Sequence, residues 1–220
     1  MIKKLIARFF PLLLLFFANC FDYEEVIYFR KPFSGYVEIT YTVPVHPRTG
    51  KSLLRFLPLT SEEIEKKINK GIFSKNLKIR EHTLTYVEKT ENDSVSFYQK
   101  KARVNYKLDF EDLNKLDGIL LGYLFVKKKG SSLIVKREFK SVLKGLDQNS
   151  TTGEKQIHAE TLKLLGDSSI LFKVIFPNNW ECRSSKGEIF LGSLVYRFPL
   201  SETVDKPGNK TWDYTMIYSN

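Results

Sequence analysis

A cysteine at position 20 closes the apolar leader of this 220-residue chain, and its thiol offers the most specific chemistry in the sequence. An uncharged apolar block, residues 9–18, precedes it and is interrupted only by Pro11. The block is too short for a transmembrane helix, which needs about 20 apolar residues. A basic start, a short apolar block and a small residue before the end are typical of a secretory signal peptide. The basic residues are Lys3, Lys4 and Arg8.

The four residues Phe17-Ala18-Asn19-Cys20 resemble the lipobox of bacterial lipoproteins, which is usually Leu, a small residue, Gly or Ala, and Cys. Phe17 and Asn19 depart from that form, in the way of the relaxed lipobox of spirochaetal lipoproteins. The resemblance implies cleavage between Asn19 and Cys20, and fatty acyl chains, palmitate among them, on Cys20. Two or three such chains hold a protein on a bilayer. The alternative is an ordinary signal peptide, or an uncleaved anchor with an incidental cysteine.

The second cysteine, Cys182, has no other partner in the sequence than Cys20. If Cys20 carries lipid, no disulfide framework supports the exported domain. A Cys20–Cys182 disulfide is the competing interpretation, but it leaves the position of the leader's end unexplained. A lone cysteine is more often a small buried apolar residue than a nucleophile.

No pattern in the sequence predicts catalysis, a metal site or a cofactor. The three histidines, His46, His82 and His158, have no second ligand at a recognised metal-binding spacing. The Gly-x-Ser-x-Gly motif and a phosphate-binding Gly-rich loop are absent. We therefore expect a protein that is not an enzyme. The carboxylates at 109–117 lack the spacing of an EF-hand and are read as caps and solvated residues.

The charge of the chain is basic but mixed in sign. The formal net charge of +10 falls to +7 with the three basic residues of the leader, because no acidic residue is lost with them. No RNP-like pattern or zinc-finger spacing is present, so we expect no nucleic-acid partner. The densest basic cluster is predicted to be a solvated hairpin tip and strand face, with anionic headgroups as the alternative contact. It comprises Lys127, Lys128, Lys129, Lys136, Arg137, Lys140 and Lys144.

Most of the sequence after the leader alternates with period two, as half-buried strands do. The expected strands are residues 37–43, 77–89, 102–110, 119–127, 133–139, 170–176, 189–198 and 211–218, with a further segment at Trp180. Short connections favour antiparallel pairing. Residues 170–176 and 189–198 are apolar on both parities, which predicts central strands covered on both faces.

Two stretches have helical spacing instead. Residues 60–71 begin with a capping box, Thr60 with Glu63, and end at Gly71; residues 151–166 repeat this order. A short turn is expected at 111–117. These patterns predict an α+β fold, a predominantly antiparallel sheet with two helices packed on it. The expected organisation is a signal peptide at 1–19, a lipidated tether at 20–33 and a single domain at 34–220.

The helix-over-sheet order and the Trp212-Asp213-Tyr214 ending resemble LppM-like envelope lipoproteins. This resemblance and the lipobox imply a lipid-anchored cell-envelope protein with a structural or interaction role. The expected partners are the membrane, through the N-terminal lipid, and a lipid or an envelope or host protein as ligand. The alternative function is binding of a lipid or other apolar ligand in a cavity between sheet and helices. A hydrolase is the third hypothesis. Phe21 after the cysteine is not the aspartate that retains enteric lipoproteins in the inner membrane, which favours the outer membrane, although Asp22, Glu24 and Glu25 resemble other acidic retention signals.

Overall fold

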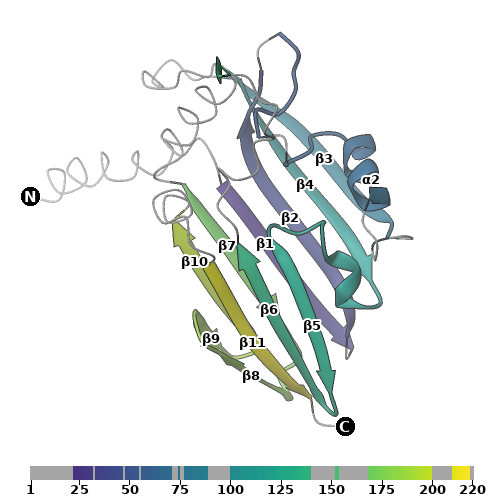
Figure 1. Cartoon of the computed structure of the whole chain (residues 1–220), viewed down its shortest axis with the longest axis vertical. Helices are drawn as coiled ribbons and strands as arrows, with labels where there is room; N and C mark the ends of the chain where they lie inside the picture. The colour runs from purple at the N-terminus through teal and green to yellow at the C-terminus, as the bar shows by residue number, and fades with distance from the viewer. Residues whose placement is uncertain are drawn as a thin grey trace, which may run out of the picture.

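The computed structural model describes residues 22–31, 33–46, 48–54, 56–70, 74, 77–88, 100–139, 152–153, 168–199 and 210–218. Two β-sheets and the helix α2 (Ser61–Lys70) make up most of this part of the chain (Figure 1). The expected helix at 151–166 lies outside the described residues except at Thr152 and Gly153. The mostly β, α+β class is therefore confirmed, with one of the two expected helices described.

The larger sheet has seven strands in the order β3-β4-β2-β1-β7-β10-β9. Its neighbours pair antiparallel except β1 and β7, which run parallel. This parallel pair departs from the expected antiparallel pairing, because β1 and β7 are far apart along the chain and no tight turn joins them. The strands are β1 (Asp22–Lys31), β2 (Ser34–Pro44), β3 (Ile79–Glu88), β4 (Lys100–Phe110), β7 (Ser169–Ile175), β9 (Glu188–Phe190) and β10 (Ser193–Pro199).

The smaller sheet has four antiparallel strands in the order β5-β6-β11-β8. The hairpin between its first two strands turns at Gly130, as the sequence predicts. The expected Trp180 segment forms an edge strand of this sheet. The strands are β5 (Tyr123–Lys129), β6 (Ser132–Phe139), β8 (Trp180–Ser184) and β11 (Lys210–Tyr218).

The segment expected as a tether is instead a central strand of the larger sheet. β1 lies between β2 and β7, and it buries Tyr23, Ile27 and Phe29 on one face. Its acidic residues hid this pattern, because Glu25 occupies the same buried parity as those apolar side chains. The folded domain therefore includes residues 22–31, and the boundary at residue 34 was wrong.

A turn divides the stretch that was expected to be one strand at 189–198. Leu191 and Gly192 connect β9 to β10, and Gly192 has a φ of 71°, which favours glycine. β9 forms an edge of the sheet, and all three of its residues are exposed. Apolar residues at both odd and even positions of this stretch therefore do not indicate a strand that is buried on both faces.

Helix α2 follows its capping box closely. The Glu63 backbone N–H donates to Thr60 Oγ1 at 3.3 Å, and Glu63 Oε2 accepts from the Leu59 backbone N–H at 2.8 Å. Ile64 and Ile68 are the buried residues of the helix. The expected turn at 111–117 is a 3₁₀ helix, η2 (Leu113–Leu116), capped by Asp112.

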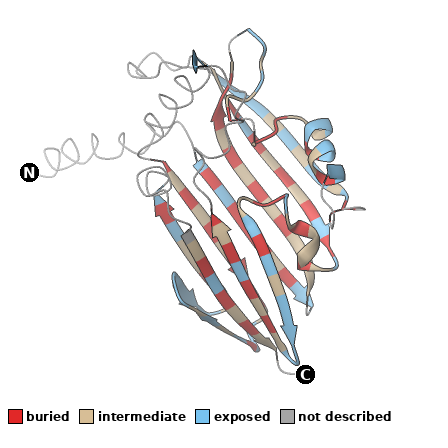
Figure 2. Cartoon of the chain, in the orientation of Figure 1, coloured by how far each residue is buried: buried red, intermediate tan, exposed pale blue. Residues whose placement is uncertain are grey.

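The smaller sheet and α2 cover the same face of the larger sheet, over different strands (Figure 1). Phe172 of β7 contacts Trp212 of β11 and Phe139 of β6, with ring centroids 5.6 and 5.1 Å apart. Tyr196 of β10 contacts Trp212 in the same way at 5.2 Å. In Figure 2, buried residues alternate with more exposed ones along the strands. Aromatic side chains therefore fill the layer between the described parts of the two sheets.

Candidate functional site

The residues with predicted roles at the leader, Asn19 and Cys20, lie outside the described part of the chain. The first described residue is Asp22, at the start of β1. Two residues of extended chain span about 7 Å at most. Any group attached to Cys20 is thus tied within a short distance of the start of a central strand.

Cys182 lies on β8 and is half-buried. Burial raises the pKa of its thiol to about 11, so the thiolate form is scarce at neutral pH. The interpretation of this residue as a small packing residue fits its surroundings. Its proposed alternative partner, Cys20, lies outside the described residues.

The described histidines make local contacts. His46 Nδ1 accepts from the backbone N–H groups of Arg48 and Thr49, both at 3.2 Å. His82 of β3 places Nε2 at 2.9 Å from Leu59 O, just before α2. Within the described ranges no group of three His, Cys, Asp or Glu side chains could hold a metal ion. His158 lies outside those ranges.

The basic cluster predicted at 127–144 is dispersed by the fold. Lys127 and Lys129 are exposed on β5, as expected for a solvated strand. Lys128 lies 4.0 Å from the centroid of the Phe33 ring and 3.7 Å from an Asp112 oxygen. Arg137, in contrast, is fully buried. Lys140 and Lys144 lie outside the described residues.

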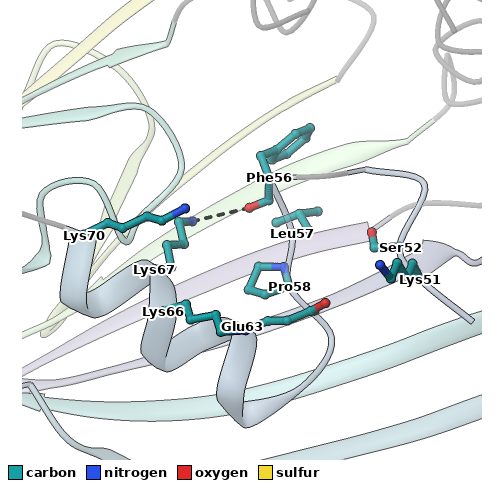
Figure 3. A pocket seen from close by; sticks show the side chains of 9 residues that line it. All are labelled: Lys51, Ser52, Phe56, Leu57, Pro58, Glu63, Lys66, Lys67 and Lys70. Atoms are coloured by element: carbon teal, nitrogen blue, oxygen red, sulfur yellow. Dashed lines mark hydrogen bonds between the residues drawn. The ribbon is translucent and has the colours of Figure 1, made fainter. Parts of the chain in front are cut away.

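A different basic site lies beside α2. A pocket of about 390 Å³ opens between this helix and the preceding loop. Figure 3 shows Lys66, Lys67 and Lys70 projecting from the helix, with the loop residues opposite. The lining residues are Lys51, Ser52, Phe56, Leu57, Pro58, Glu63, Lys66, Lys67 and Lys70.

The helix brings these side chains together by its period. Positions 66 and 67 follow position 63 by three and four residues, and position 70 follows them by four and three, so all four lie on one face of α2. Ile64 and Ile68 occupy the buried face beside it. Lys51 comes from the loop after β2 and completes the pocket from the other side. The site therefore depends on the loop before α2 folding back along the helix.

Lys67 is the most constrained of these lysines. Its Nζ donates to Ile119 O at 2.8 Å and to Phe56 O at 3.4 Å. Burial lowers its pKa to about 8, and the Glu25 carboxylate acts in the opposite direction. Two neutral carbonyls thus hold an ammonium group in place without compensating its charge.

Glu25 belongs to a buried ion pair that joins the two sheets. Arg137 Nη1 lies 2.5 Å from Glu25 Oε1, and the two side chains are 0 % and 1 % exposed. Arg137 also donates to Leu121 O, and the Tyr23 hydroxyl donates to Glu25 at 3.0 Å. Burial alone would lower the pKa of Arg137, but the Glu25 carboxylate more than offsets it and the pKa is raised. The charge of Glu25 is therefore already matched inside the core.

A second pocket, of about 320 Å³, lies where β1 begins. Arg103 of β4 and Arg197 of β10 line it together with Asp22. Burial raises the pKa of Asp22, while the charges of Arg103, Arg197 and Lys101 act to lower it. This pocket is mixed in sign, whereas the pocket beside α2 is predominantly basic.

The pocket beside α2 was not predicted from the sequence. A stripe of lysines on an amphipathic helix is typical of a solvated surface, and nothing local links it to Lys51. The signal that could have indicated it is the excess of positive charge on one face of the helix, where three lysines accompany one glutamate. Among the described residues, no helix is long and apolar enough to cross a membrane.

Comparison with known proteins places the chain in a family. The family described as LIC11874-like matches residues 15–219. Among solved structures, the chain is similar to the folded domain of LppM from Mycobacterium tuberculosis, with 11% identity, a TM-score of 0.46 and 92% of each chain covered. No curated protein matches the chain.

Proposed function

The chain belongs to the LIC11874-like family, and we propose that it is a lipid-anchored protein of the cell envelope with a structural or interaction role and no catalytic activity. The observation that carries this proposal is the leader: a basic start and an apolar block that end at Cys20. The lipid would be added to the Cys20 thiol first, and cleavage behind Asn19 would follow.

The fold is compatible with this form of attachment. β1 begins at Asp22, so the domain would be held close to the bilayer with only one residue between Cys20 and the first strand. Two or three acyl chains keep a protein on a membrane without any help from its surface. The folded domain is then left available for a partner, which we propose to be an envelope or host protein. The outer membrane is the proposed location.

The second candidate function is binding of a lipid or another apolar ligand. Aromatic side chains already fill the layer between the described parts of the two sheets, so such a ligand would bind outside that layer. The pocket beside α2 has an apolar wall of Phe56, Leu57 and Pro58 and supports this candidate as a place for part of such a ligand.

Intact-mass measurement of the membrane-extracted protein tests the anchoring. The wild-type chain is expected to lack residues 1–19 and to carry the mass of two or three acyl chains. Cys20→Ser is expected to carry no acyl mass and to keep the leader, because the lipid acceptor is gone. Cys182→Ser is the matched control and should keep both the cleavage and the lipid. A wild-type mass that retains residues 1–19, or that shows no acyl groups, would overturn the proposal.

A further inference from the structure

We propose that the pocket beside α2 binds an anionic group of the phosphate class, recognised by Lys51, Lys66, Lys67 and Lys70. This inference goes beyond the anchoring proposed above and does not depend on Cys20. The first reason is the charge of the pocket: four ammonium groups and one carboxylate, that of Glu63, line it.

The four lysines have no carboxylate within ion-pair distance in the described part of the chain. Lys66 and Lys70 are also four apart on the helix, a spacing at which like charges repel. Glu63 Oε2 is engaged by the Leu59 backbone N–H. The Glu62 carboxylate acts on Lys66 from the exposed side of the helix, and a dianion in the pocket would relieve the repulsion that remains.

The second reason is the position of Lys67. Its two carbonyl partners, Ile119 O and Phe56 O, occupy two of the three N–H donors of the ammonium group. They orient the side chain before a ligand arrives, which lowers the entropic cost of binding. The third donor remains for an anion in the pocket.

The charged groups around Lys67 come from three elements. Glu63, Lys66 and Lys70 lie on α2, Lys51 lies on the loop opposite, and Glu25 acts from β1. Glu25 is paired with Arg137. Apart from Glu63, the charged groups that share the pocket with Lys67 are therefore lysines, and an added anion would stabilise its protonated form.

The apolar wall restricts what the anion can be attached to. Phe56, Leu57 and Pro58 face the lysines across the pocket. They suit the glycerol or acyl stem of a lipid phosphate, and they also leave room for a free phosphate. The chemistry shared by both is a phosphate oxyanion held by ammonium donors.

Calorimetric titration of the full-length protein in a non-ionic detergent tests the site with two probes. One is inorganic phosphate, and the other is a short-chain phosphatidylglycerol below its micelle concentration. Saturable binding of either probe is expected; tighter binding of the lipid would identify a headgroup as the source, and tighter binding of phosphate a free ion. Absence of saturable binding by both would overturn the proposal.

Variants then locate the binding. Lys67→Met should weaken it about tenfold or more, since a hydrogen bond to a charged group is lost. Lys70→Met removes an exposed charge without touching the core and should weaken it about threefold to tenfold. Glu63→Gln keeps an oxygen for the Leu59 N–H and should tighten binding. The matched control is Lys127→Met on β5, which should change nothing. Equal affinities for Lys70→Met, Lys127→Met and wild type would place the ligand elsewhere and refute the site.

The pH dependence supplies a readout that a structural role would not move. Lys67 has a pKa near 8 in the free protein, so it is charged below that pH and must take up a proton on binding above it. Affinity should therefore fall as the pH rises through 8. Lys67→Arg, whose guanidinium stays charged, should remove this fall and retain binding. A fall of the same size in Lys67→Arg would contradict the role given to Lys67.

Discussion

At the scale of single residues, the largest difference between sequence and structure is the Glu25–Arg137 pair. Both residues were read as surface charges, one in a tether and one in a basic cluster. Their positions in the strands contradict that interpretation. Glu25 lies on the same buried face of β1 as Tyr23 and Ile27, and Arg137 lies on the same buried face of β6 as Val135 and Phe139. Position in the alternation was therefore a better guide to burial than residue type. Single charges on a buried parity are ambiguous until a partner from another strand is known.

The burial of the Glu25–Arg137 ion pair predicts a large effect on the free energy of unfolding when one partner is removed. Arg137→Met leaves Glu25 buried without its partner, so we expect the free energy of unfolding to fall by about 3–5 kcal/mol. The combined variant Glu25→Leu with Arg137→Met removes both charges and should recover much of that loss. Denaturant unfolding followed by tryptophan fluorescence measures both values.

The control is the neighbouring pair on the other face of β6. Lys136 Nζ lies 2.7 Å from Glu138 Oε1, and the Lys136 side chain is half exposed. Surface pairs contribute about 0–1 kcal/mol, so Lys136→Met should change little. If Arg137→Met costs no more than Lys136→Met, the ion pair is not buried between the sheets as described.

At the scale of elements, local patterns predicted most of what the structure describes. The capping box placed α2 within one residue of each observed end, because its signals are all local. β2, β4 and β6 follow their alternation for the same reason. The break between β9 and β10 was missed, since Leu191 continues the apolar run and only Gly192 indicates a turn. That tip leaves Leu191 87% exposed.

The hairpin between β1 and β2 contains a position where only glycine fits. A Cβ added to Gly35 would lie 1.8 Å from the carbonyl oxygen of Tyr28 on β1. Backbone atoms cannot move aside as a flexible side chain can, so Gly35→Ala should lower the free energy of unfolding by about 1–3 kcal/mol or more. Ser34→Ala, one residue earlier, is the matched control and should change it by less than about 0.5 kcal/mol. Thermal unfolding measures both variants. Equal losses of stability in Gly35→Ala and Ser34→Ala would contradict the hairpin geometry described here.

At the scale of the whole molecule, the sequence predicted the class of fold but not its arrangement. β11 pairs with both β6 and β8, and β1 pairs with β7, although these strands are far apart along the chain. Period-two alternation says which face of a strand is buried and nothing about which strand lies beside it. The pocket beside α2 has the same origin, because Lys51 meets the helix only through the fold. The leader could be predicted from the sequence because all the residues of its pattern lie in one continuous stretch of the chain.

The central position of β1 predicts that the domain needs this strand to fold. A chain that begins at residue 22 keeps all described strands and should unfold in one cooperative transition. A chain that begins at residue 34 loses the strand between β2 and β7, the burial of Tyr23, Ile27 and Phe29, and the partner of Arg137. Each buried apolar side chain contributes about 1.5–3 kcal/mol, and the unpaired arginine costs about 3–5 kcal/mol. These losses together reach the whole stability of a typical domain, about 5–15 kcal/mol. The shorter chain should therefore show no cooperative transition by circular dichroism, whereas equal transitions in both chains would make residues 22–33 a tether after all.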